Sequence, residues 1–107
     1  MRDERADHVL IWEFRVRPGR EAEFERAYGP AGDWVRLFDS AAGYLGTELF
    51  RDPDDPRRYL TVDRWASAEA FARFREARGA EYEALDARCS RWTEDETPLG
   101  AWRVVRG

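Results

Sequence analysis

The order in which strand-like and helix-like segments follow one another limits this chain to few folds. Large apolar side chains at every second position predict strands over residues 8–16, 44–51, 58–65 and 99–105. Helical spacing predicts a helix from Glu21 to Tyr28, a short second piece capped by Asp33, and a long helix capped by Ser67. The order is therefore strand, helix, strand, strand, helix, strand.

Glycines, prolines and acidic residues interrupt these segments. Gly29 and Pro30 divide the first helical region in two, and Gly79 predicts a kink in the long helix. Two prolines within residues 52–56 predict a tight turn. The acidic residues 94–96 and Pro98 predict a connector before the last strand.

This order is that of the ferredoxin-like βαββαβ fold, an α+β architecture. Its split βαβ units build a four-stranded antiparallel sheet with helices on one face. With 107 residues, the chain is expected to form one domain over residues 1–107, with a core of about 8–105. The uncovered sheet face would carry Val9, Ile11, Leu60 and Val62, an apolar patch larger than a monomer usually exposes. We therefore expect a homodimer that packs sheet against sheet.

Charge and composition exclude several classes of partner and cofactor. The net charge is −4 and the signs alternate, which disfavours nucleic acid and anionic membranes as partners. Residues 58–63 also lack the glycine-aromatic run of RNA-recognition modules. No apolar run approaches the roughly 18 residues that cross a bilayer, so a cytoplasmic protein is expected.

The residues that usually hold metals or cofactors are scarce. The chain has one cysteine, Cys89, and one histidine, His8, which cannot form a disulfide or a Cys/His zinc site within one chain. The acidic turn at residues 52–55 lacks the glycine and distal glutamate of a calcium loop. No glycine run has the spacing of a phosphate-binding loop. We expect neither metal nor cofactor.

Five tryptophans on different segments are the feature that most exceeds composition. Leucine or phenylalanine fills a small core more simply, because the indole N–H needs a partner. Trp12 and Trp65, on facing predicted strands, therefore suit a pocket wall as well as a core. The candidate substrate-binding residues are Trp12, Trp34, Phe38, Tyr59, Thr61, Phe74 and Tyr82.

Asp63 is the candidate proton acceptor. Alternation places it on one strand face with Tyr59, Thr61 and Trp65, and a carboxyl among aromatic rings has a raised pKa. The alternative is an ion pair with an arginine on a neighbouring segment. His8 is the one histidine that could serve as a base, but its position beside the charged N-terminal residues suits a solvated or dimer-contacting imidazole better.

Three stretches of the sequence resemble the antibiotic biosynthesis monooxygenase family. They are FRVRPGRE at residues 14–21, GYLGTEL at 43–49 and YLTVDRWASAEAF at 59–71, and the likeness covers about residues 8–105. Its most specific element is Trp65 at the end of a strand, followed by a capped helix start. The resemblance implies a dimeric α/β barrel with a pocket between the sheet and helices of each subunit. The candidate catalytic residues are Trp65, which matches the family pattern, and Asp63, which its position on the strand suggests.

The resemblance also implies a reaction. Family members that act on polyketide phenols oxidise them to quinones with molecular oxygen and without metal or flavin. Haem-degrading relatives use an asparagine on the first strand and a histidine on the second helix, whereas this chain has no asparagine and no histidine after His8. Two hypotheses stay open: a cofactor-independent oxygenase of a small aromatic or quinol substrate, and a non-catalytic dimeric module that binds a small aromatic ligand or supports a pathway. A polar group beside a pocket-bound ring favours the first, and a pocket filled by Trp12, Trp34 and Trp65 favours the second.

Overall fold

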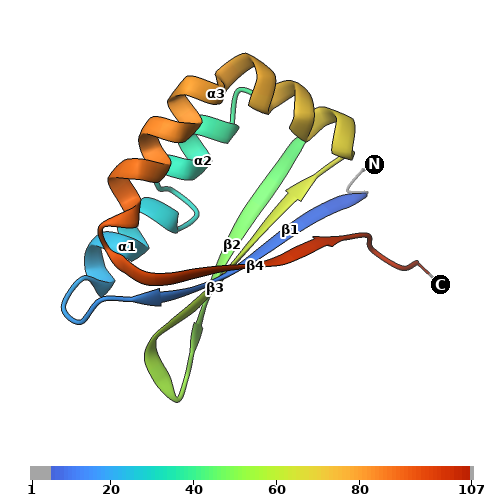
Figure 1. The fold of residues 1–107 in the computed structure, drawn as a ribbon. Coiled ribbons are helices and arrows are strands. Elements are labelled where there is room, and N and C mark those ends of the chain that lie inside the picture. The colour runs from blue at the N-terminus through green and yellow to red at the C-terminus, as the bar shows by residue number, and fades with distance from the viewer. Residues whose placement is uncertain (1–5, 107) are drawn as a thin grey trace.

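The computed structural model describes residues 6–106 and shows helices packed on a four-stranded sheet (Figure 1). The elements are β1 (His8–Val16), α1 (Glu21–Tyr28), α2 (Asp33–Phe38), β2 (Tyr44–Asp52), β3 (Asp55–Trp65), α3 (Ala68–Ser90) and β4 (Thr93–Trp102). This order confirms the predicted βαββαβ fold, with α1 and α2 as the two pieces of the first helical region. One detail was wrong: Gly32 occupies the N-cap position of α2, and Asp33 is the first helical residue. The Asp33 carboxylate pairs with Arg36 and Arg88 and caps no backbone N–H.

The strands lie in the order β2-β3-β1-β4, and every neighbouring pair is antiparallel. The two central strands are therefore β1 and β3. Their register places Leu10 opposite Asp63 and Trp12 opposite Thr61. Because side chains alternate between the faces of a strand, these four residues share one face of the sheet.

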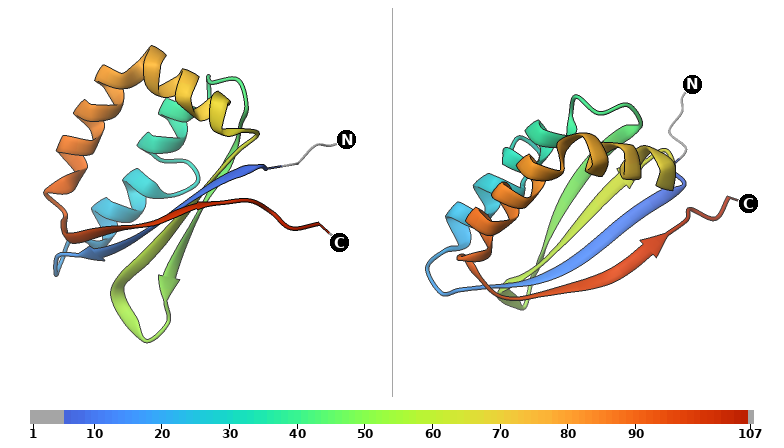
Figure 2. Two further views of the ribbon diagram at one scale, coloured as in Figure 1. Left: turned by 45° about the vertical axis from the view of Figure 1, so that its right-hand side comes forward. Right: turned by 45° about the horizontal axis from the view of Figure 1, so that its top comes forward.

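All the helices cover that same face, as the two views in Figure 2 show. The core between helices and sheet is mainly aromatic: Phe24 of α1 stacks on Tyr28 at 4.2 Å between ring centroids and tilts against Tyr59 at 4.8 Å. The most deeply buried side chains are Val16, Phe24, Tyr59, Trp65 and Cys89. Within residues 6–106, no helix combines the length and apolar character that a membrane span requires.

The last strand begins earlier than the sequence predicts. We expected a connector at residues 94–98 and a strand over 99–105, whereas β4 runs from Thr93 to Trp102. Its pairing with β1 explains the difference, since Thr93 already lies opposite Val16 and Glu96 opposite Phe14. An edge strand tolerates Pro98 because one side of its backbone has no neighbouring strand to bond. Two register shifts interrupt the pairing of β1 with β4, so the side chains of β4 do not alternate regularly. This irregularity is why the alternation pattern did not predict a strand there.

The turn after β2, the cap of α3 and the kink in α3 are all found where the sequence predicts them. Asp52 pairs with Asp55 across a two-residue turn, and the Asp52 carboxylate accepts a hydrogen bond from the Asp54 N–H at 2.8 Å. This tight turn lets β3 begin at Asp55, earlier than the predicted residue 58. Ser67 caps α3 by accepting from the Ala70 N–H at 3.1 Å. Arg78, next to Gly79, has non-helical angles (φ −124°, ψ 27°), which confirms the predicted kink.

No helix within residues 6–106 covers the opposite face of the sheet. Ile11 and Val62 lie opposite each other at its centre, with Val9 beside them. Towards the edges, Phe50 of β2 and Trp102 of β4 are 48% and 56% exposed. The register puts Phe50 opposite Leu60 and Trp102 opposite Val9, so all belong to this face. We call this set, Val9, Ile11, Phe50, Leu60, Val62 and Trp102, the open apolar face.

The chain enters β2 through a glycine that has both a conformational and a steric requirement. Gly43 has φ +91°, and a Cβ there would lie 2.6 Å from the Cβ of Ala70 on α3. Gly19 has a similar φ of +83° with open space around it. Gly19→Ala should therefore lower the free energy of unfolding by about 1–2 kcal/mol, the cost of the left-handed conformation alone. Gly43→Ala should lower it by about 3 kcal/mol or more, because α3 must also move.

Urea denaturation of both variants measures how much the steric contact with α3 adds to the cost of the left-handed conformation. Equal losses at Gly43 and Gly19 would contradict a tight contact between α3 and the start of β2.

Candidate functional site

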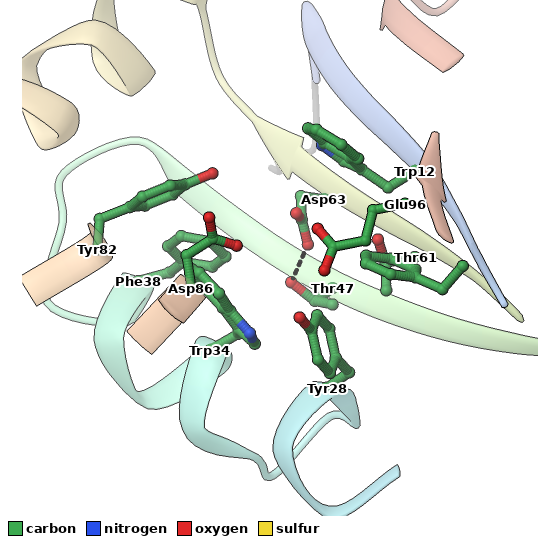
Figure 3. A pocket seen from close by; sticks show the side chains of 11 residues that line it. Trp12, Tyr28, Trp34, Phe38, Thr47, Thr61, Asp63, Tyr82, Asp86 and Glu96 are labelled. Atoms are coloured by element: carbon green, nitrogen blue, oxygen red, sulfur yellow. Dashed lines mark hydrogen bonds between the residues drawn. The ribbon is translucent and has the colours of Figure 1, made fainter. Parts of the chain in front are cut away.

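A cavity of about 100 Å³ lies between the helices and the covered face of the sheet (Figure 3). Every element from β1 to β4 contributes to its wall. The lining residues are Trp12, Phe14, Tyr28, Trp34, Phe38, Thr47, Thr61, Asp63, Tyr82, Asp86 and Glu96. An engineered cavity of about 150 Å³ holds benzene, so this space is on the scale of a single aromatic ring.

Aromatic rings form most of the wall because β1 and the three helices present large aromatic side chains to it. Trp34 of α2 lies between Tyr28 of α1 and Tyr82 of α3, with ring centroids 5.9 and 5.1 Å away. Trp12 of β1 closes the sheet side and stacks along Phe14 at 6.3 Å. A space bounded mainly by aromatic rings remains between them.

Asp63 is the polar centre of the cavity. It sits on β3 between Leu10 of β1 and Thr47 of β2, and its Oδ1 accepts a hydrogen bond from the Thr47 hydroxyl at 2.7 Å. Thr47 Oγ1 also lies 2.6 Å from the Tyr44 hydroxyl. The single hydroxyl hydrogen of Thr47 is used on Asp63, so Tyr44 is the donor to Thr47. A chain of hydroxyls thus leads from Tyr44 to the carboxylate.

The surroundings of Asp63 penalise its charge. Burial raises the pKa of the Asp63 carboxyl to about 6, and the hydrogen bond from Thr47 offsets only part of that effect. Within the described residues no arginine forms an ion pair with Asp63, so the alternative of a salt bridge has no support there. A carboxyl with a pKa near 6 can take a proton from a ligand at neutral pH.

Two more carboxyls reach the cavity, and sequence reasoning missed both. Glu96 of β4 is half-buried and accepts from the Thr93 hydroxyl at 2.9 Å. Burial raises the pKa of Glu96, the bond from Thr93 lowers it, and the charge of Asp86 on α3 raises it further. Asp86 is exposed at the rim of the cavity and lies one helical turn after Tyr82. That spacing was a usable signal for Asp86, whereas Glu96 was hidden in the predicted connector.

The cavity also includes Thr47 and Tyr28, which were not among the predicted site residues. Thr47 could have been found from the alternation of its strand, since it pairs with Asp63. Tyr28 was recognised in the sequence only as part of a buried helical stripe. Its ring is buried at 5% exposure, and its hydroxyl points into the cavity (Figure 3).

The structure brings six of the predicted site residues together on the cavity wall: Trp12, Trp34, Phe38, Thr61, Asp63 and Tyr82. Three others lie elsewhere. Tyr59 is buried, and its hydroxyl donates to Glu25 at 2.6 Å, away from the cavity. Phe74 and Trp65 are buried behind the wall.

Trp65 supports the wall and does not line it. Its indole is fully buried, 5.5 Å from Phe38 and 5.3 Å from Tyr44 between ring centroids. The Trp65 Nε1 has no acceptor among the described residues. Trp65 therefore contacts Phe38, a residue of the cavity wall. It also contacts Tyr44, whose hydroxyl begins the hydrogen-bonded chain that ends at Asp63.

No cluster of three or more histidine, cysteine or acidic side chains within residues 6–106 is arranged to hold a metal ion. The three carboxyls of the cavity come from three different elements, Asp63 from β3, Glu96 from β4 and Asp86 from α3. The arrangement therefore provides an aromatic slot with separate acidic groups around it.

Comparison with known proteins gives a family and a fold. The sequence model of the family described as "Antibiotic biosynthesis monooxygenase" matches residues 8–84. Among curated protein sequences, none matches significantly. Among solved structures, a variant of SnoaB from Streptomyces nogalater, described as a cofactor-independent oxygenase, is 21% identical with a TM-score of 0.78, covering 95% of this chain and 97% of that one.

Two further solved structures have the same fold. A proposed antibiotic biosynthesis monooxygenase of Bordetella bronchiseptica is 24% identical with a TM-score of 0.72, over 95% of this chain and 98% of that one. A proposed antibiotic biosynthesis monooxygenase from Nitrosomonas europaea is 15% identical with a TM-score of 0.70, over 92% and 99%. At these identities the structural likeness establishes the fold alone.

The raised pKa of Asp63 predicts a stability effect with a definite sign. Between its ordinary value of 3.8 and about 6, the folded protein holds a proton that the unfolded chain releases, so stability is lost as the pH rises through this window. Asp63→Asn cannot ionise and still accepts from Thr47. At pH 7.5 this variant should be more stable than the parent by up to about 3 kcal/mol, and at pH 4 the two should be nearly equal.

Thermal melts at the two pH values provide the measurement. A stability difference that does not change between pH 4 and pH 7.5 would contradict a penalised charge at Asp63.

Proposed function

Because the chain belongs to the antibiotic biosynthesis monooxygenase family, we propose that its cavity oxidises a small phenolic or quinol-type aromatic substrate with molecular oxygen, without metal or flavin. The observation that carries the proposal is Asp63, a carboxyl with a pKa of about 6 in an aromatic cavity of single-ring size. The family supplies the class of chemistry, and the cavity supplies a place for one ring and one acceptor for its proton.

The substrate ring would lie against the aromatic wall, with its hydroxyl towards Asp63. Trp12 and Trp34 give the slot its apolar surfaces, and Tyr82 encloses it from α3. Thr47 holds the carboxylate by its Oδ1, which leaves Oδ2 available to the phenol. Binding in this orientation removes the entropy cost of bringing a free phenol and a free base together in water.

Once the phenol has lost its proton, the resulting phenolate can itself reduce molecular oxygen. Asp63 takes the phenol proton, and the phenolate passes one electron to oxygen. The two radicals combine at a ring carbon that bears hydrogen, and the proton returns from Asp63 to give a hydroperoxide. The ring hydrogen and the terminal OH then leave as water while the O–O bond breaks and a second carbonyl forms. One phenol and one O₂ therefore give one quinone and one H₂O.

Trp65 has a positioning role in this proposal. It packs edge-on against Phe38, with 76° between the ring planes, and fixes that ring in the cavity wall. It also packs on Tyr44, the first donor in the hydroxyl chain to Asp63. Its effect on a substrate would pass through these two neighbours.

The alternative, a non-catalytic module, predicts a pocket filled by its own tryptophans. Trp12 and Trp34 leave a cavity between them and the helices, and Asp63 reaches into it. This arrangement supports the oxygenase hypothesis over a plain binding module.

Oxygen uptake tests the proposal. A panel of single-ring phenols and hydroquinones, incubated with and without oxygen, should include a substrate whose oxygen consumption exceeds the enzyme-free rate. Asp63→Asn should reduce that rate by about 10² or more, because it removes the proton acceptor and keeps the shape of the side chain. Asp54→Asn, in the exposed β2–β3 turn, is the matched control and should leave the rate unchanged.

Two outcomes count against this function: no substrate in the panel raises oxygen consumption, or Asp63→Asn retains the parent rate.

We also propose that two copies of the chain pack through the open apolar face. Val62 and Ile11 lie at its centre, and Phe50 is half-exposed at its edge. Burial of this face in a stable dimer needs an interface above roughly 1,000 Å². Light scattering should then give about 25 kDa, twice the chain mass of 12.5 kDa.

Glutamate substitutions at the edge and at the centre of the open apolar face test this interface. Phe50→Glu should give a folded monomer, because Phe50 is already half in solvent, and Val62→Glu should dissociate or unfold the protein. A parent protein that stays monomeric at all micromolar concentrations contradicts the dimer. So does a dimer that Phe50→Glu leaves intact.

A further inference from the structure

Three carboxyls from three elements surround the cavity, and no basic side chain among residues 6–106 lines it. Asp63 comes from β3, Glu96 from β4 and Asp86 from α3, and Figure 3 shows all three turned towards the same space. Although the chain contains 18 arginines, no ion pair joins any of the three carboxyls to an arginine within residues 6–106. Other acidic side chains of the sheet do have such partners, for example Glu48 with Arg64 and Glu13 with Arg58. The cavity is therefore acidic without internal compensation.

A second observation points to a missing ligand. The Trp34 side chain is 93% buried, at 7% exposure, and its indole Nε1 has no hydrogen-bond partner among the described residues. It lines the cavity (Figure 3). Buried polar groups are nearly always paired in folded proteins. An unpaired indole N–H on the wall of an open space indicates that a bound molecule supplies the acceptor.

The aromatic wall would stabilise a positive charge as well. The faces of Trp and Tyr rings attract cations, and this attraction grows where water is excluded. Trp12 and Trp34 enclose the space that the carboxyls surround, whereas the Tyr82 ring already has the Arg75 guanidinium over it, 4.0 Å from the ring centroid. The carboxyls are not arranged as ligands of one metal ion within the described residues. A larger organic cation, an alkylammonium group, fits separated acids and aromatic faces.

We propose that the substrate of this cavity is a phenol that carries a protonated amine on a short chain. The aromatic ring fills the slot, the phenol hydroxyl meets Asp63, and the ammonium lies towards Glu96 and Asp86 at the rim. This placement of the ring rests on the proposed function. The positive charge also helps the reaction, because removal of the phenol proton then leaves a zwitterion in place of a net anion among carboxylates.

A series of ligands that differ only in charge tests the inference. Tyramine, 4-propylphenol and 3-(4-hydroxyphenyl)propionate have the same ring and chains of similar length, with charges of +1, 0 and −1. Binding is measured by calorimetry under nitrogen, so that no turnover is needed. Tyramine should bind at least about tenfold more tightly than 4-propylphenol, and the propionate should bind most weakly.

Variants of Glu96 and Asp86 test whether these rim carboxyls cause the preference for tyramine. The double variant Glu96→Gln, Asp86→Asn should reduce the advantage of tyramine over 4-propylphenol to less than about threefold, while Asp54→Asn should leave it unchanged. Equal binding of the three ligands, preference for the propionate, or no binding of any of them overturns the inference. A tyramine preference without oxygen uptake would leave the charge selectivity standing and would reject the oxygenase function. Oxygen uptake on neutral phenols without a tyramine preference would do the reverse.

Discussion

The register between β1 and β3 is the constraint on which the rest of this structure depends. It places Trp12 opposite Thr61 and Leu10 opposite Asp63, so that the cavity wall and its carboxyl enter the covered face together. A shift by one residue would turn Asp63 outwards and bring Val62 under the helices. The same pairing thus divides the chain into a reactive face and an associating face. The aromatic core stabilises it, because Trp65 and Tyr59 of β3 are almost completely buried beneath the helices in this register.

The cavity exists at a cost to stability. Asp63 carries a charge that its surroundings disfavour, and the indole N–H groups of Trp34 and Trp65 are buried without acceptors. A core built for stability alone would replace such groups with apolar ones. Unpaired polar groups concentrated on and behind one small cavity are typical of a site where binding or chemistry has set the composition.

The sequence predicts the architecture well and the site incompletely, for physical reasons. Alternation over His8–Val16 and the cap at Ser67 depend on local backbone preferences, and both are found as predicted. Alternation also placed Asp63 on the correct face. It could not give depth, so Trp65 was expected on the cavity wall and lies behind it. Glu96 was missed because its strand is an irregular edge strand whose existence depends on pairing with β1.

The kink at Arg78 divides α3 into two halves with separate duties. The first half buries Ala70 and Phe74 near the start of β2, where Gly43 leaves no space for movement. The second half, held by Leu85 and Cys89, carries Tyr82 and Asp86 over the cavity. Substitutions after the kink can therefore reshape the cavity while the part of the helix that secures the fold stays in place. The fold can thus acquire new specificities through one short stretch of the chain, which makes that stretch the natural target for evolution and for redesign.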